Sequence, residues 1–215
     1  MKKDFFKRFL SSVILLPISF FFLYQGSYLF NFFIITCFFI SAYEWHKMSK
    51  KKVFAYIGFV FLIFSFYTLY KLRNDFLIEV TVFVLLICVS TDTGGYLFGK
   101  FFKGPKLTKI SPKKTYSGTI GGYVFSVAAL LLYTSFINSS IFIQFNKEIF
   151  YFVVIISTVS QLGDIFISYF KRLSKIKDTG KIIPGHGGIL DRIDGMIFAI
   201  PFSYILLKLN LLNLL

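Results

Sequence analysis

Cysteine, histidine and charged side chains are all scarce in this sequence of 215 residues, which contains two Cys, two His and only 16% charged residues. The two cysteines, Cys37 and Cys88, provide no disulfide framework and no zinc-site spacing. No internal repeat of fixed period is visible. The low charge, together with 56% hydrophobic and 21% aromatic residues, excludes an ordinary soluble domain.

Long apolar runs dominate the sequence instead. A helix needs roughly 20 apolar residues to cross the hydrocarbon core of a bilayer, and about seven such runs are present. They cover residues 9–25, 27–45, 53–70, 76–98, 118–138, 149–170 and 194–211. The sequence therefore predicts an all-α, polytopic integral membrane protein in which residues 1–215 form a single membrane domain. Because no small-residue cleavage site follows the basic, apolar start, we expect that start to be retained as a first helix.

The charge is strongly basic, with 24 Lys and Arg against 10 Asp and Glu and a formal net charge of +14. Most of the basic residues lie before the first predicted span and after the second, fourth and sixth. Since Lys and Arg are retained on the cytoplasmic side, this distribution predicts a cytoplasmic N-terminus and cytoplasmic polar loops, with no nucleic-acid partner. The lysines of residues 47–52 are interpreted as a rim that meets lipid headgroups.

Asp92 is one of two carboxylates that lie inside apolar spans next to the polar loops. A charged group in a membrane helix normally faces a cavity and has a partner, although an interfacial position is the alternative here. Gly95 and Gly99, at i+3 and i+7 from Asp92, leave one helix face without side chains. Such a face allows a ligand or, more commonly, another helix to approach closely.

Asp164 is the second carboxylate inside an apolar span. It shares one helix face with Ser168 and Lys171, because the three residues are spaced i, i+4 and i+7. A carboxylate, a hydroxyl and an ammonium are thereby aligned toward the cytoplasmic end of the helix. The alternative is that Asp164 serves only as a hydrogen-bonding residue between helices.

Residues 177–194, KDTGKIIPGHGGILDRID, form a glycine-rich polar segment. Gly185, Gly187 and Gly188, which flank His186, can adopt positive φ and expose backbone N–H groups to an anion. Asp191 and Asp194 at i and i+3 face the same way at the start of a helix.

Alone, this pair of acids is typical of helix capping. Together with Asp164, the two acids are suited to hard divalent cations. The bases suited to neutralising phosphate oxygens are Lys171, Arg172, Lys177 and Arg192. The pattern favours a metal-assisted phosphoryl site.

Residues 168–194, SYFKRLSKIKDTGKIIPGHGGILDRID, resemble the signature of the phosphatidate cytidylyltransferases, the CDP-diacylglycerol synthases. Residues 92–122 are also similar to an inner loop of that family, and ISPKKT is the most diagnostic part. The resemblance covers about residues 90–200, which we expect to be the catalytic part. The chain departs from the family pattern at Ile167 and Ser117, where many members have Glu.

The resemblance implies a metal-dependent nucleotidyltransferase, located in the cell inner membrane with its active site on the cytoplasmic side. Its substrates would be CTP and phosphatidate in the bilayer, its products CDP-diacylglycerol and pyrophosphate, and its cofactor Mg²⁺. The implied metal ligands are Asp164, Asp191 and Asp194. The expected catalytic residues are Asp164, Lys171, Arg172, Asp191 and Arg192. The expected substrate-binding residues are Ser168, Lys113, Lys114, Lys177, His186, Gly187 and Gly188.

Several alternatives stay open at this point. His186 either contacts a phosphate or ribose or is a structural residue of its turn, and a second metal ion and a homodimer are both open. A related CTP-using lipid kinase would release CDP instead of pyrophosphate. A secondary transporter and a catalytically silent membrane scaffold are the two non-enzymatic hypotheses.

Overall fold

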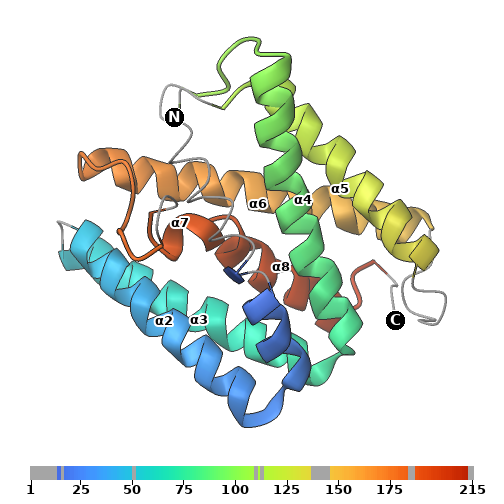
Figure 1. Cartoon of the computed structure of the whole chain (residues 1–215), viewed down its shortest axis with the longest axis horizontal. Coiled ribbons are helices and arrows are strands. Elements are labelled where there is room, and N and C mark those ends of the chain that lie inside the picture. The colour runs from blue at the N-terminus through green and yellow to red at the C-terminus, as the bar shows by residue number, and fades with distance from the viewer. Residues whose placement is uncertain are drawn as a thin grey trace. The chain divides into compact units, whose positions relative to one another are not determined.

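The computed structural model describes residues 14–15, 17–49, 52–108, 111, 114–136, 146–183 and 187–212. Its helices are α2 (Ser27–Met48), α3 (Lys52–Asp75), α4 (Ile78–Phe101), α5 (Tyr116–Phe136), α6 (Lys147–Leu173), α7 (Leu190–Ile193) and α8 (Met196–Lys208) (Figure 1). Residues 17–25 are also helical, and isolated antiparallel bridges join Lys106 to Thr115 and Ile183 to Gly187. Because no strand occurs in the described ranges, the predicted all-α class is confirmed.

Five helices, α2 to α6, contain stretches long and apolar enough to cross a membrane. The shorter α8 has 13 residues and rises about 20 Å, less than the roughly 30 Å of a hydrocarbon core. It lies within the predicted span 194–211, and the predicted span 9–25 begins outside the described residues. The multi-pass helical character is therefore confirmed, whereas the number of about seven spans stays a prediction.

Polar side chains and one backbone reversal set the limits of α5 and α6. Thr115 Oγ1 accepts the N–H of Gly118 at 3.1 Å, and Asn146 Oδ1 accepts the N–H of Ile149 at 2.7 Å. Both residues satisfy backbone donors that the first helical turn leaves unpaired. After α6, Lys175 adopts a φ of 56°, a left-handed conformation typical of helix C-termini. This reversal leads the chain out of the apolar helix and into the polar segment.

The chain divides into two compact units. Unit 1 comprises Met1–Tyr70 and Phe170–Asp194, and unit 2 comprises Lys71–Tyr169 and Gly195–Leu215. Helices α3 and α6 each contribute residues to both units. The polar segment belongs to unit 1 and Asp164 belongs to unit 2, so the candidate site residues are distributed over both.

In unit 1, α2 and α3 run side by side (Figure 1). The Trp45 ring lies so close to Gly58 that any Cβ there would clash with it, and Trp45 Nε1 donates to the Ala55 carbonyl at 3.2 Å. Phe170, near the end of α6, packs edge-on against Trp45 and Phe54, with ring centroids 5.1 and 5.6 Å apart. Each such aromatic pair contributes about 0.5–1.5 kcal/mol beyond the area it buries. These contacts attach the end of α6, which leads into the polar segment, to α2 and α3.

In unit 2, α4 and α5 pack closely through glycine residues. A Cβ at Gly118 would lie 2.8 Å from the Gly95 carbonyl oxygen, and a Cβ at Gly121 would lie 2.7 Å from that of Gly94. A Cβ at Gly99 would lie 3.7 Å from the Gly118 Cα. The predicted glycine strip at Gly95 and Gly99 therefore serves close packing of one helix on another, the more common of the two uses considered.

Candidate active site

A buried ion cluster in unit 1 joins the last turn of α6 to α7. Lys171 Nζ lies 3.0 Å from Asp191 Oδ1 and 3.4 Å from Asp194 Oδ2, and all three residues are buried. The prediction that Asp191 and Asp194 face the same way is confirmed, because both reach one ammonium. Two carboxylates and one ammonium leave the cluster with an excess of negative charge.

The second carboxylate oxygen of Asp191 holds the polar segment. Asp191 Oδ2 accepts the N–H of Thr179 at 2.7 Å and that of Gly188 at 2.9 Å. Gly187 has a φ of 91°, and a Cβ there would lie only 2.6 Å from Asp191 Oδ2, so both the backbone conformation and the space require glycine. The predicted positive φ is confirmed at Gly187. The N–H of Gly188, predicted to face a ligand anion, donates to Asp191 because a carboxylate of the protein itself lies there.

Glu44 of α2 is a functional candidate that the sequence analysis missed. The residue is 1% exposed, and its carboxylate accepts hydrogen bonds from Thr179 Oγ1 at 3.0 Å, Ile189 N at 3.1 Å and Leu190 N at 2.8 Å. Its position in the sequence could have identified it, because Glu44 lies near the end of the apolar run 27–45, where an acid needs a partner. Like Asp92 and Asp164, Glu44 is a carboxylate near the polar end of an apolar run.

A second carboxylate–lysine pair lies in unit 2. Lys114 Nζ lies 2.6 Å from Asp164 Oδ2, and Ser168 Oγ donates to Asp164 Oδ1 at 3.2 Å. The Lys114 and Asp164 side chains are 22% and 29% exposed, respectively. The predicted contact along one helix face is therefore confirmed for Asp164 and Ser168, whereas Lys171, the third residue predicted there, pairs with Asp191 and Asp194. Lys114, in the ISPKKT loop, is the third member of this group. Helical spacing could not predict this contact, because Lys114 is distant from Asp164 in the sequence.

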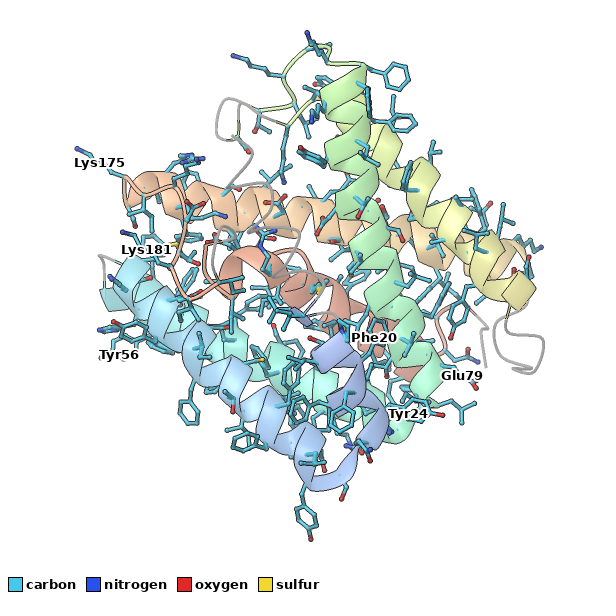
Figure 2. The ribbon with its side chains drawn as sticks, in the orientation of Figure 1. Phe20, Tyr24, Tyr56, Glu79, Lys175 and Lys181 are labelled. Atoms are coloured by element: carbon cyan, nitrogen blue, oxygen red, sulfur yellow. The ribbon has the colours of Figure 1, made fainter. Side chains whose placement is uncertain are left out.

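The other predicted bases, in the polar segment and at the end of α6, are exposed. Arg172, Lys177 and Arg192 all have exposed side chains. Figure 2 shows that Lys175, just before the polar segment, and Lys181, within it, extend away from the ribbon. Exposed cations on such long side chains are accessible to the phosphate groups of a soluble ligand.

The two departures from the family pattern have ordinary local roles. Ile167 is 2% exposed and packs as an apolar side chain. Ser117 Oγ donates to the Lys103 carbonyl and lies 2.9 Å from Thr115 Oγ1. Neither Ile167 nor Ser117 belongs to the two carboxylate–lysine groups described above.

The structure thus brings predicted residues together in two separate groups. The group in unit 1 contains Lys171, Asp191, Asp194, Gly187 and Gly188. The group in unit 2 contains Asp164, Ser168 and Lys114. Lys113 and His186 lie outside the described residues. The prediction that Asp164 and Asp191 serve one metal centre stays a prediction, since they belong to different compact units.

The donor set in unit 1 is suited to a hard divalent cation. Asp191 and Asp194 already share one cation, the Lys171 ammonium. Within the ranges that the structure describes, no group of three or more His, Cys, Asp or Glu side chains could hold a metal. Mg²⁺ commonly uses only one or two carboxylates and completes its shell with water and substrate phosphates. The residues present therefore fit a metal that is bound together with a phosphorylated substrate.

Long apolar helices and buried ion pairing in a polar segment define the class of this molecule. It is a multi-pass helical membrane protein by the length and composition of its helices, with a cluster of Lys and Asp suited to phosphate and cation chemistry. The sequence comparison then gives the particular family. The model of the cytidylyltransferase family matches residues 6–81 and 52–210, so the chain belongs to that family.

Individual relatives named phosphatidate cytidylyltransferase support the same assignment. The protein from Rickettsia felis is 34% identical over 215 residues, which cover 94% of this chain and 92% of the relative. The Staphylococcus aureus protein is 42% identical over 159 residues, and the Staphylococcus saprophyticus protein is 40% identical over 157 residues. Each of these two matches covers 71% of this chain but 56% of the relative. The chain thus spans little more than half the length of the staphylococcal proteins. The family membership and these relatives confirm the resemblance inferred from the signature.

Proposed function

We propose that this protein is a phosphatidate cytidylyltransferase that converts CTP and phosphatidate to CDP-diacylglycerol and pyrophosphate. A phosphate oxygen of the lipid attacks the α-phosphorus of CTP, the bond from that phosphorus to the β-phosphate oxygen breaks, and pyrophosphate leaves. No nucleophilic side chain is needed, because the lipid phosphate is already ionised. Support comes from membership of the cytidylyltransferase family and from the names of the relatives.

The observation that carries the proposal is the buried cluster of Lys171, Asp191 and Asp194. It lies within the segment that resembles the family signature. Both substrates are anions, so their approach requires cationic groups near the reacting phosphates. In the proposal, Lys171, Arg172 and Arg192 neutralise charge on the reacting phosphates. The substrate-binding residues proposed with them are Ser168, Lys113, Lys114, Lys177, His186, Gly187 and Gly188.

We also propose that turnover depends on Mg²⁺, held by Asp164, Asp191 and Asp194. When bound, Mg²⁺ would supply positive charge to the triphosphate oxygens. The chain's own residues then have two duties. Asp191 and Asp194 present carboxylate oxygens that the Lys171 ammonium neutralises only in part, and Lys114 holds the Asp164 carboxylate in unit 2.

The proposal places the protein in the cell inner membrane with about seven spans and with the polar loops on the cytoplasmic side. The distribution of Lys and Arg supports this orientation, and the exposed bases of the polar segment suit a water-soluble nucleotide. The diacyl tails would stay in the bilayer while the lipid phosphate reaches the site. The same proposal allows the protein to form a homodimer and the site to hold a second metal ion.

Purified protein supplied with labelled CTP and phosphatidate tests the reaction. We expect CDP-diacylglycerol and pyrophosphate in equal amounts, and we expect excess EDTA to stop the reaction and added Mg²⁺ to restore it. Release of CDP with a phosphorylated lipid would move the protein to the lipid kinases. Full turnover in excess EDTA would refute the metal dependence while leaving the transferase assignment intact.

A further inference from the structure

Glu44 lies on α2, far in sequence from the polar segment, yet its carboxylate accepts three hydrogen bonds from that segment. We propose that Glu44 is a positioning residue for cytidylyl transfer, holding residues 179–180 and 188–190 so that Asp191 stays against Lys171. This inference rests on the proposed function. It gives α2 a role in the reaction site, although α2 lies outside the signature segment.

The hydrogen bonds of Glu44 tie together two parts of the segment. Its Oε2 accepts from Thr179 Oγ1 at 3.0 Å and from Leu190 N at 2.8 Å, and its Oε1 accepts from Ile189 N at 3.1 Å. The residue is 1% exposed, so without these donors an unpaired carboxylate would be buried at high cost. The carboxylate and the segment therefore order each other.

Asp191, which belongs to the segment itself, accepts hydrogen bonds from the same two parts. Thr179 donates its hydroxyl to Glu44 and its backbone N–H to Asp191 Oδ2 at 2.7 Å. The N–H of Gly188 goes to Asp191, whereas those of the next two residues go to Glu44. Loss of Glu44 would therefore loosen the donors that orient Asp191. It would also loosen the arrangement that brings Asp191 Oδ1 to the Lys171 ammonium.

The absence of side chains at two glycines makes room for the Glu44 carboxylate. A Cβ at Gly180 would lie 2.5 Å from Glu44 Oε1, and a Cβ at Gly188 would also clash with the carboxylate. The neighbouring part of α2 strengthens the attachment, because the Met48 carbonyl accepts the Ser174 hydroxyl. With both oxygens engaged by protein donors, Glu44 is suited to positioning the segment. It is not suited to contacting phosphate, which carries the same sign of charge.

The test compares Glu44→Gln with Glu148→Gln in the purified full chain. Glu148 provides the same substitution at a site where the side chain is 31% exposed and lies 3.9 Å from Lys147. Four quantities are measured. They are kcat and KM for CTP per folded molecule, hydrogen–deuterium exchange of peptides covering residues 176–183 and 187–193, and the thermal unfolding midpoint. An amide in place of Glu44 turns an NH₂ group toward at least one of the N–H or O–H donors.

For Glu44→Gln we expect kcat/KM to fall about 10- to 100-fold, the scale of one buried donor left unpaired. We also expect both peptides to exchange faster, and Glu148→Gln to match the wild type. Thr179→Val is a milder second variant, since it removes one donor but keeps both backbone bonds to Glu44. We expect it to lower kcat/KM by about 3- to 10-fold.

The outcomes separate the two proposals. Wild-type kinetics and exchange in both variants would overturn the positioning role. A lower unfolding midpoint with unchanged turnover per folded molecule would also overturn it, because Glu44 would then only stabilise the fold. If the wild type transferred no cytidylyl group while Glu44→Gln still accelerated exchange of both peptides, the proposed function would fall. The attachment of the segment by Glu44 would then be supported on its own.

Discussion

Asp191 in unit 1 and Asp164 in unit 2 each pair with a lysine, but their surroundings differ. Asp191 is buried and accepts from Lys171, Thr179 and Gly188. Asp164 is 29% exposed at its side chain and accepts from Lys114 and Ser168. The first carboxylate is held by two backbone donors as well as by an ammonium, whereas the contacts of the second within the described part of the chain come from side chains alone.

This difference separates what each carboxylate contributes to folding from what it contributes to chemistry. Breaking a buried ion pair by removing one charge typically costs about 3–5 kcal/mol. A partly exposed pair is usually worth about 0–1 kcal/mol, because water screens it. Asp191 should therefore matter for both the local structure and the reaction. Asp164 should matter mainly for the reaction, so variants that separate stability from turnover test the comparison directly.

Asp191→Asn should have the largest effect. An amide cannot accept from both backbone N–H groups and also carry the charge that Lys171 requires, so one set of donors loses its partner. We expect turnover to fall at least about 1,000-fold and the unfolding free energy to fall by about 3 kcal/mol or more. Initial rates in the CTP assay and thermal unfolding in detergent measure the two effects.

Asp178→Asn is the matched control for Asp191→Asn. Asp178 is exposed in the same segment, and substitutions at such surface positions usually change stability by less than about 0.5 kcal/mol. We expect turnover close to that of the wild type. Equal losses in the two variants would mean that the segment tolerates no change of charge at all, and the special position of Asp191 would be lost.

Asp164→Asn should reduce turnover strongly with little effect on stability. The substitution removes the charge proposed to serve the metal, but the amide oxygen can still accept from Ser168. We expect turnover to fall about 100- to 1,000-fold and the unfolding free energy to change by less than about 1 kcal/mol. A stability loss as large as that of Asp191→Asn would remove the distinction between the two carboxylates.

Local spacing explains which parts of these sites could be predicted from the sequence. The apolar runs predicted the long helices, the i, i+3 spacing predicted the convergence of Asp191 and Asp194, and the i, i+4 spacing predicted that of Asp164 and Ser168. Glu44 and Thr179 are 135 residues apart, so only tertiary structure could pair them. Likewise, a glycine turn predicts available N–H groups but not which carboxylate accepts them.

Lys114→Gln should have a smaller effect than either aspartate substitution. It removes the ammonium 2.6 Å from Asp164 Oδ2, in a pair that is partly open to solvent. We expect kcat/KM for CTP to fall about 10-fold, on the scale of one charge-assisted contact, with stability within about 1 kcal/mol of the wild type. Lys106→Gln, an exposed position in the same loop, is the control. Equal effects from both lysines would indicate a general role of loop charge.

The smallest expected effect is the additional loss when Asp164→Asn and Asp191→Asn are combined. Residues that act as one catalytic unit are strongly non-additive, because removing either one already disables the unit. If both carboxylates serve one metal centre, as we propose, the double variant should be slower than Asp191→Asn by less than about 3-fold. The assay needs enough sensitivity to quantify the residual rate of Asp191→Asn, so it is run at saturating CTP with high enzyme concentration. Losses that multiply would show that the two carboxylates act independently, each in its own unit.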